Sequence, residues 1–170
     1  MTITASTILT ARLRLTPLVV DDADAMVTVL GDARMYEFTG GAPLSLDDLR
    51  DRYGQLVGGR SADGAELWFN WIVRLDSDGS VVGAMQATVS ATGSSAEVAW
   101  EVGVAWQRRG FASEAAAGIV EWLVDEGVDQ VRASIHPGHH ASIKVAAKCG
   151  FSPTAETIEG ETVWLRTVFR

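Results

Sequence analysis

The sequence predicts a mixed α/β (α+β) fold, in which a mostly antiparallel central sheet is flanked by helices, in one domain spanning residues 1–170. Three observations predict it. With 170 residues, of which 47% are hydrophobic, the chain has the size and apolar content of one domain. Strand-like segments follow one another across short turns in the middle of the chain, which is typical of antiparallel pairing. A further strand then leads through a glycine-bearing loop into an amphipathic helix.

The first third of the chain predicts one strand and two helices. Leucines alternate with arginines in the segment 10–18, as in a half-buried strand. The pair Asp21–Asp22 offers an N-cap for a helix that reaches Leu30. Ser45 is placed to cap a second helix, in which apolar residues recur at helical spacing as far as Leu56.

The rest of the chain predicts strands that alternate with two more helices. The expected elements are strands at 68–75, 81–89 and 98–102, a helix at 113–126, a strand at 131–135, a helix at 141–149 and a last strand at 163–169. Asp76-Ser-Asp-Gly79 predicts a hairpin turn between the first two of these strands. Gly127 and Gly150 follow the two helices and are typical helix stops.

Composition excludes several classes of function. Fourteen basic against 22 acidic residues give a formal net charge of −8, whereas a nucleic-acid-binding surface is basic. No apolar run approaches 18 residues, and residues 1–9 lack the pattern of a signal peptide. Cys149 is the only cysteine, so an internal disulfide is excluded and a reducing compartment is expected. We therefore expect a cytoplasmic protein with no nucleic-acid or membrane partner.

The loop Gln-Arg-Arg-Gly-Phe-Ala, residues 107–112, joins the strand at 98–102 to the helix that follows. A helix N-terminus leaves several backbone N–H groups unpaired, and the helix dipole makes that end favourable for an anion. Gly110 lets the backbone come close to a ligand, and two arginines add positive charge. The segment predicts a pyrophosphate-binding loop, with a basic surface turn as the alternative.

This loop resembles the Q/R-x-x-G-x-G/A signature with which the GNAT acyltransferases hold the pyrophosphate of acetyl-CoA. The opening Thr-x-Arg-Leu-x-Leu-x-Pro-Leu, residues 10–18, resembles the branch that includes the ribosomal-protein N-terminal acetyltransferases. Near the end, Ser142, Gly150 and Phe151 match a third family pattern, in which His139 replaces the usual asparagine. Because the three matches occur in the family's order over nearly the whole chain, the sequence is identified as a member of this family.

The resemblance implies a GNAT fold with splayed central strands and acetyl-CoA as the co-substrate. Free backbone N–H groups at the end of the central strand would meet the pantetheine and the acyl carbonyl, and Gly103 would permit a bulge there. The residues implied to bind acetyl-CoA are Val102, Gly103, Val104, Gln107, Arg108, Arg109, Gly110, Phe111, Ala112, Ser113, His139 and Ser142.

Acyl transfer to an amine needs a group that takes the amine proton and a group that can protonate the sulfur. Glu97 and Glu101 lie on one face of the central strand, where burial would raise a carboxyl pKa toward neutrality. The position of Glu97 relative to the loop makes it the preferred base, although either glutamate can also be a surface carboxylate. Ser142 resembles the serine proposed to lie beside the sulfur, although it is also an ordinary helix-start residue. The tyrosine that many GNAT enzymes carry in the short helix is Ala146 here.

The resemblance implies acetyl transfer from acetyl-CoA to a primary amine, either a peptide N-terminus or a small molecule, by direct attack in a ternary complex. The alternatives are a non-catalytic acyl-CoA-binding or sensing module and a transferase that uses another donor, such as succinyl-CoA. Candidate acceptor contacts are Glu37, Phe38 and Tyr53, with packing as the alternative role of the two aromatic residues. We expect no metal site, because the loop histidines have no evident fourth ligand. Dimers are common in the family, so a homodimer stays open.

Overall fold

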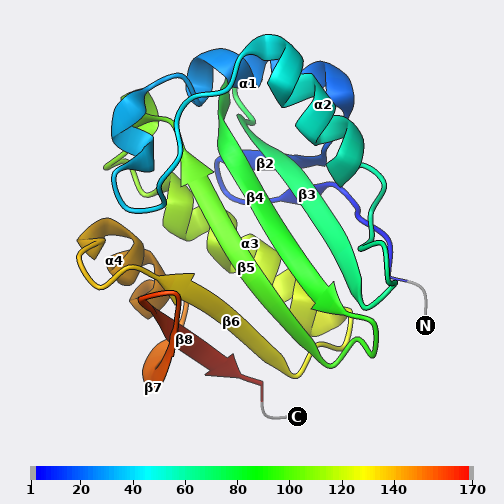
Figure 1. Cartoon of the computed structure of the whole chain (residues 1–170), viewed down its shortest axis with the longest axis vertical. Helices are drawn as coiled ribbons and strands as arrows, with labels where there is room; N and C mark the ends of the chain where they lie inside the picture. Colours follow the sequence, from blue (N-terminus) through cyan, green and yellow to red (C-terminus); the bar gives the residue numbers. More distant parts are fainter. Residues whose placement is uncertain (1–2, 169–170) are drawn as a thin grey trace.

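A computed structural model describes residues 3–168, which form an eight-stranded sheet and four α-helices (Figure 1). The order across the sheet is β1-β2-β3-β4-β5-β6-β8-β7, and every neighbouring pair is antiparallel except the parallel pair β5 and β6. The strands are β1 Ile8–Leu9, β2 Leu13–Pro17, β3 Glu66–Leu75, β4 Val81–Ser90, β5 Ser95–Val102, β6 Gln130–Ile135, β7 Ser152–Ile158 and β8 Glu161–Thr167. The predicted mixed, mostly antiparallel sheet is therefore confirmed.

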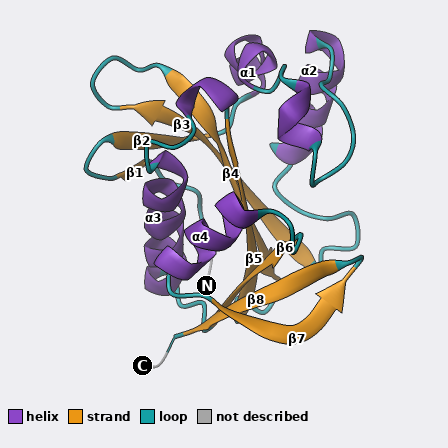
Figure 2. Ribbon diagram, turned by 90° about the vertical axis from the view of Figure 1, so that its left-hand side faces the viewer, coloured by secondary structure: helices purple, strands orange, loops and turns teal. Residues whose placement is uncertain are grey.

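The helices cover the two faces of the sheet in pairs (Figure 2). They are α1 Ala23–Val29, α2 Leu46–Leu56, α3 Phe111–Asp125 and α4 His140–Lys148. The larger core lies under α3 and α4, where Ile119 and Leu123 pack among buried residues of the central strands. A smaller core under α1 and α2 contains Met26, Leu49 and Ile72. The sheet thus has one fully packed face and one face that is only partly covered.

Local sequence signals explain most of the helix boundaries. The Oγ of Ser45 accepts a hydrogen bond from the backbone N–H of Asp48 at 3.2 Å, so the predicted cap of α2 is present. Asp22 behaves differently from its prediction, because its carboxylate bonds to the side chain of Arg74 and to the backbone N–H of Val19 instead of capping α1. The first helix therefore starts from a 3₁₀ turn at Val20–Asp22.

Two strands were missed by the sequence analysis. β1 has two residues, and β7 is an exposed edge strand that carries Pro153 and pairs only with β8, so neither shows clear alternation of buried and exposed residues. The last predicted strand reaches Phe169, which lies outside the described residues. Within residues 3–168, no helix combines the length and the apolar character that crossing a membrane requires.

The parallel pair β5 and β6 separates along its length. The strands pair only from Ser95 to Glu97 on β5 and from Gln130 to Arg132 on β6, although β5 continues to Val102 and β6 to Ile135. Backbone groups that face this gap on the later part of β5 have no neighbouring strand to bond. The expected splayed central strands are present.

Candidate active site

The loop between β5 and α3 has the geometry of an anion cradle. Gly110 adopts a left-handed conformation with φ of 80° and precedes the first turn of α3, which Phe111, Ala112 and Ser113 form. Within the described residues, the backbone N–H groups of Arg108, Arg109 and Gly110 donate no hydrogen bond. These donors and the α3 N-terminus are suited to a phosphate group.

Both loop arginines are exposed and leave the backbone accessible. Arg108 also has a positive φ, at 63°, which is unusual for a residue with a side chain and turns the chain sharply before Gly110. The guanidinium of Arg109 lies 5.3 Å from the ring centroid of Trp106. The two side chains therefore add positive charge at the rim of the cradle.

Arg12, which the sequence analysis placed in the opening motif without a role at the loop, holds the cradle from outside the loop. Its Nη1 donates to the carbonyl oxygen of Arg109 at 3.0 Å, and its Nε donates to the carboxylate of Glu114 at 2.7 Å. The guanidinium lies 4.6 Å from the ring centroid of Phe111. The hydrogen bond between Arg12 and Arg109 joins residues 97 positions apart, so no local sequence pattern could reveal it.

Glu114 is fixed in the ionised form by these contacts. Burial alone would raise the pKa of its carboxyl group, but hydrogen bonds from Thr10 and from the backbone and side chain of Arg12 outweigh burial and lower the pKa. An ionised Glu114 in the first turn of α3 anchors Arg12 against the loop.

The end of β5 offers different donors from those expected. The N–H of Gly103 is already used, because it donates to the carbonyl oxygen of Val82 at 2.9 Å. Antiparallel pairing alternates the direction of backbone groups, so the N–H groups of Trp100 and Val102 point away from β4 and toward the gap beside β6. The free donors of this strand are therefore those of Trp100 and Val102.

Gly103 is also not a bulge, because the β4–β5 register continues without a shift. A Cβ at Gly103 would lie 2.9 Å from Cγ1 of Val29, so the close approach of α1 accounts for the glycine. Val104 begins a 3₁₀ turn, and the side chain of Gln107 donates to the carbonyl oxygen of Val102 at 3.0 Å. Gln107 thus ties the loop to the end of β5.

A small cavity of about 100 Å³ lies at the gap between β5 and β6. Ser142, in the first turn of α4, accepts a hydrogen bond from the indole N–H of Trp100 at 3.2 Å, and its Oγ lies 3.4 Å from Nε2 of His139. All three residues line the cavity, together with Ala99 and Phe38. The structure thus brings the predicted Ser142 and His139 to the gap.

His139 is held by an aromatic neighbour. Its ring stacks on Phe38 with centroids 4.7 Å apart and an interplanar angle of 15°. Burial lowers the pKa of His139, and the charge of His136 lowers it further, which favours a neutral imidazole. In residues 3–168, no three His, Cys, Asp or Glu side chains come together as a group that could hold a metal ion.

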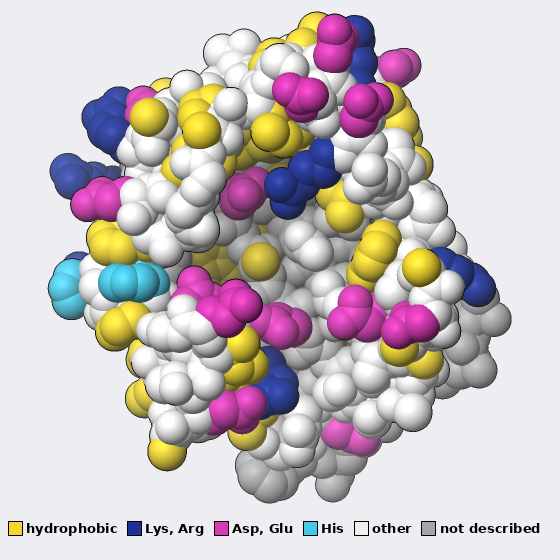
Figure 3. All heavy atoms as spheres, viewed as in Figure 1, with side chains coloured by type: hydrophobic (Ala, Val, Ile, Leu, Met, Phe, Trp, Pro, Cys, Tyr) yellow, Lys and Arg dark blue, Asp and Glu magenta, His cyan; other side chains and the backbone are white. Residues whose placement is uncertain are grey.

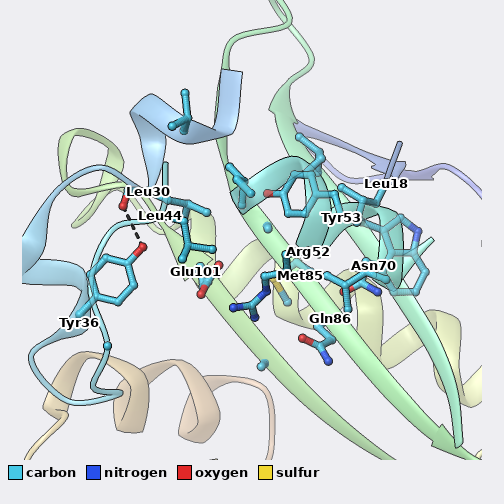
Figure 4. A pocket seen from close by; sticks show the side chains of 18 of the residues that line it. Leu18, Leu30, Tyr36, Leu44, Arg52, Tyr53, Asn70, Met85, Gln86 and Glu101 are labelled. Atoms are coloured by element: carbon cyan, nitrogen blue, oxygen red, sulfur yellow. Dashed lines mark hydrogen bonds between the residues drawn. The ribbon is translucent and has the colours of Figure 1, made fainter. Parts of the chain in front are cut away.

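A larger cavity of about 300 Å³ opens on the α1 and α2 side of the sheet. Figure 3 shows this face hollowed near its centre. The walls are largely apolar, and the polar side chains that line the cavity are Tyr36, Arg52, Tyr53, Asn70, Gln86 and Glu101 (Figure 4). Tyr36 is fixed by a hydrogen bond from its hydroxyl to the carbonyl oxygen of Leu30, at 2.9 Å. Tyr53 thus lines this cavity, whereas Glu37 lines neither of the two.

Glu101 lines this cavity beneath the surrounding atoms, yet its side chain remains exposed to solvent through the cavity mouth. Burial raises the pKa of Glu101, and the charge of Arg52 partly opposes this rise. Burial and the nearby charge of Glu101 also raise the pKa values of Tyr36 and Tyr53. Both tyrosines are therefore neutral near pH 7, and Glu101 is the acidic group of the cavity.

The two predicted glutamates occupy different surroundings. Glu97 accepts a hydrogen bond from the hydroxyl of Ser134 at 2.8 Å and lines neither cavity. Glu101 lies four residues further along β5, about 13 Å away at the usual rise of a strand. Between them, Ala99 lines both cavities and lies on the same face of the strand as the two glutamates.

Comparisons with known proteins agree with this architecture. Residues 12–152 match the family model described as an acetyltransferase (GNAT) domain. The chain is similar to an acetyltransferase of the GNAT family from Bacillus anthracis, with a TM-score of 0.79 and 17% identity over 95% of this chain and 98% of that one.

Two further solved structures carry coenzyme A. RimL, a ribosomal-protein alpha-N-acetyltransferase, has a TM-score of 0.81 and 13% identity over 96% of this chain and 98% of that one. The aminoglycoside acetyltransferase AAC(6')-Ib has a TM-score of 0.73 and 18% identity over 91% of this chain and 94% of that one. No curated protein matches the sequence. Because the family model covers most of the chain, this protein belongs to the GNAT family of acetyltransferases and is an N-acetyltransferase of the GNAT type.

Proposed function

We propose that the protein transfers an acetyl group from acetyl-CoA to a primary amine by direct attack in a ternary complex. The observation that carries this proposal is the position of Ala99, which lines the small cavity beside the gap and the large cavity under α1 and α2. A thioester on one side and an amine on the other can therefore meet at one residue of β5. Similar proteins that were solved with coenzyme A support the choice of donor.

The cradle fits the pyrophosphate of the donor. The unpaired N–H groups of the loop and the α3 N-terminus bind the phosphate oxygens, and Arg108 and Arg109 add charge at the rim. The free N–H groups of Trp100 and Val102 donate to the pantetheine and to the thioester carbonyl, which polarises the carbonyl for attack. The pantetheine follows the gap from the loop toward Ala99.

We propose Glu101 as the general base in place of Glu97. Its pKa is raised by burial, and it lies in the cavity that is large enough to hold an acceptor. The amine nitrogen forms a bond to the acetyl carbon while its proton passes to Glu101, directly or through water. The carbon–sulfur bond then breaks, and the hydroxyl of Ser142 donates a hydrogen bond to the departing sulfur.

We also propose that residues 1–170 act as one domain in the cytoplasm, which the continuous sheet and the buried free thiol of Cys149 support.

The test compares Glu101→Gln with Glu97→Gln, which are the same substitution on the same strand face. Release of the CoA thiol is measured from acetyl-CoA with a panel of peptides and small primary amines. We expect Glu101→Gln to lower kcat by at least about 100-fold, the scale of general base catalysis, and Glu97→Gln to change it little. Because only the carboxylate accepts a proton, wild-type kcat should rise as the pH climbs through the raised pKa of Glu101. That acid limb should persist in Glu97→Gln and disappear in Glu101→Gln.

Other outcomes would change specific parts of the proposal. An equal loss confined to Glu97→Gln would return the base to Glu97. Faster turnover with succinyl-CoA than with acetyl-CoA would correct the donor. Binding of acetyl-CoA without transfer to any amine of the panel would contradict the proposed reaction.

A further inference from the structure

The larger cavity holds two opposite charges, Glu101 and Arg52, that attract each other but form no hydrogen bond or ion pair between them. Within the described residues, Arg52 forms no ion pair and no hydrogen bond, and the carboxylate of Glu101 has no hydrogen-bond partner. Figure 4 shows the Arg52 side chain between Glu101 on one side and Asn70 and Gln86 on the other. Elsewhere on α2, Arg50 is paired with Asp24 at 2.6 Å. An unpaired guanidinium that lines a cavity is therefore available to a ligand.

Asn70 gives a second, independent sign of a ligand. Its amide nitrogen is buried and has no hydrogen-bond partner among the described residues, although the residue lines the cavity. A buried donor that lacks a partner is unfavourable, and a ligand that supplies an acceptor satisfies it. The terminal torsion of asparagine is broad, so a small rotation can turn the amide toward the cavity. Asn70 and Arg52 are both donors suited to an anion.

The rest of the cavity suits an apolar body. Leu18, Leu30, Leu44, Leu49, Leu56 and Met85 contribute to the wall. A volume of about 300 Å³ is at the lower end of the range for small-molecule sites, so the occupant is small. A bare hydrophobic amine would pair with Glu101 and leave the guanidinium of Arg52 without an anionic partner. A ligand with both a cationic and an anionic group leaves neither Glu101 nor Arg52 unpaired.

We propose that the acceptor is a small apolar amine that also carries a carboxylate, as a free apolar amino acid does. Its amino group faces Glu101 and Ala99, its carboxylate binds Arg52 and the amide of Asn70, and its apolar side chain packs among the leucines. This inference rests on the proposed acetylation of amines and names the acceptor class of that site. Arg52 becomes a specificity-determining residue, because the cavity discriminates against an amine that leaves its guanidinium unpaired.

The experiment compares leucine and phenylalanine with their carboxamides, which lack only the negative charge. For each pair, kcat/KM with acetyl-CoA is measured in wild type, Arg52→Gln and Arg50→Gln. We expect wild type to prefer the amino acid, and Arg52→Gln to reduce the ratio of amino acid to amide by about tenfold, the effect of one lost charged hydrogen bond. Amide formation also lowers the amine pKa, but this effect is the same in all variants and cancels when their ratios are compared.

Arg50→Gln is the matched control, because Arg50 lies two residues away on α2 and does not line the cavity. It should leave the ratio unchanged. A ratio that is also unchanged in Arg52→Gln, or a wild type that acetylates the amides and not the amino acids, would overturn the inference.

Binding without turnover separates this inference from the proposed reaction. Calorimetry with leucine alone should show binding in wild type that Arg52→Gln weakens about tenfold, whether or not acetyl transfer occurs. Such binding with no acetylation would contradict the reaction and keep the anion-bearing ligand. Acetylation of other amines, with no binding or turnover of either amino acid, would contradict the ligand and keep the reaction.

Discussion

The cofactor cradle and the acceptor cavity lie on the same strand but are built in opposite ways. The cradle is one continuous stretch, residues 102–113, to which Arg12 is the main distant addition. The cavity takes its lining from α1, the loop before α2, α2 itself and the strands β3, β4 and β5. The residues of a site made by one segment form a continuous sequence pattern. A site assembled from several segments can instead change its specificity through single substitutions.

The largest effect should come from breaking the cradle at its tightest point. Gly110→Glu places a side chain at a left-handed residue, with a Cβ 3.3 Å from Nη2 of Arg12, and adds a negative charge beside the phosphates. Like charges in contact cost several kcal/mol, so we expect the acetyl-CoA dissociation constant to rise at least about 100-fold. Calorimetry with acetyl-CoA measures this change.

Gly93→Glu is the matched control for backbone strain. Gly93 also has a positive φ, at 74°, and no atom lies within 4 Å of the position of its Cβ. It lies in the turn before β5, far along the strand from the cradle. Gly93→Glu should lose a similar amount of stability and keep acetyl-CoA binding. Equal binding in both variants would mean that the donor does not use this loop.

The same contrast explains what could be predicted from the sequence. The strand, loop and helix around Gly110 follow from local periodicity and glycine placement, and Ser142 was found because it matches, with Gly150 and Phe151, a pattern of the family. Arg12 and Arg52 were missed because their roles depend on contacts with residues far away in the chain. Of the expected strand donors, Gly103 is unavailable because its N–H is bonded to β4, and strand register, which decides this, is not visible in residue types.

Glu97 and Glu101 show the same limit within one strand. Both lie on one face, so periodicity alone cannot separate them. The surroundings of the two glutamates differ because α2 and the preceding loop form a wall of the cavity in which Glu101 lies. A sequence pattern identifies the strand face, and only the packing of distant helices shows which carboxylate lines a cavity.

Removing Arg12 should have an intermediate effect and tests whether the cradle needs its distant addition. Arg12→Ala removes the bonds to Arg109 and Glu114, and we expect acetyl-CoA binding to weaken by about tenfold. Lysine should not rescue it, because one ammonium cannot reproduce the two directions in which the guanidinium donates. Arg14→Ala is the control, since Arg14 lies two residues further along the chain, in β2, and pairs with Asp76 instead. If both variants bind equally, the loop holds its shape without Arg12.

The smallest effect should come from Ser142→Ala, because the leaving group needs little help. A thiol has a pKa near 8.5, well below that of an alkyl amine, so the sulfur departs as a thiolate without prior protonation. We expect kcat to fall only a few-fold and the acetyl-CoA dissociation constant to stay nearly constant. Urea unfolding should show a loss of about 1 kcal/mol, because the indole N–H of Trp100 loses its acceptor. A 100-fold fall in kcat, with the same modest loss of stability, would instead show that proton donation by Ser142, on the cofactor side of Ala99, is a required step.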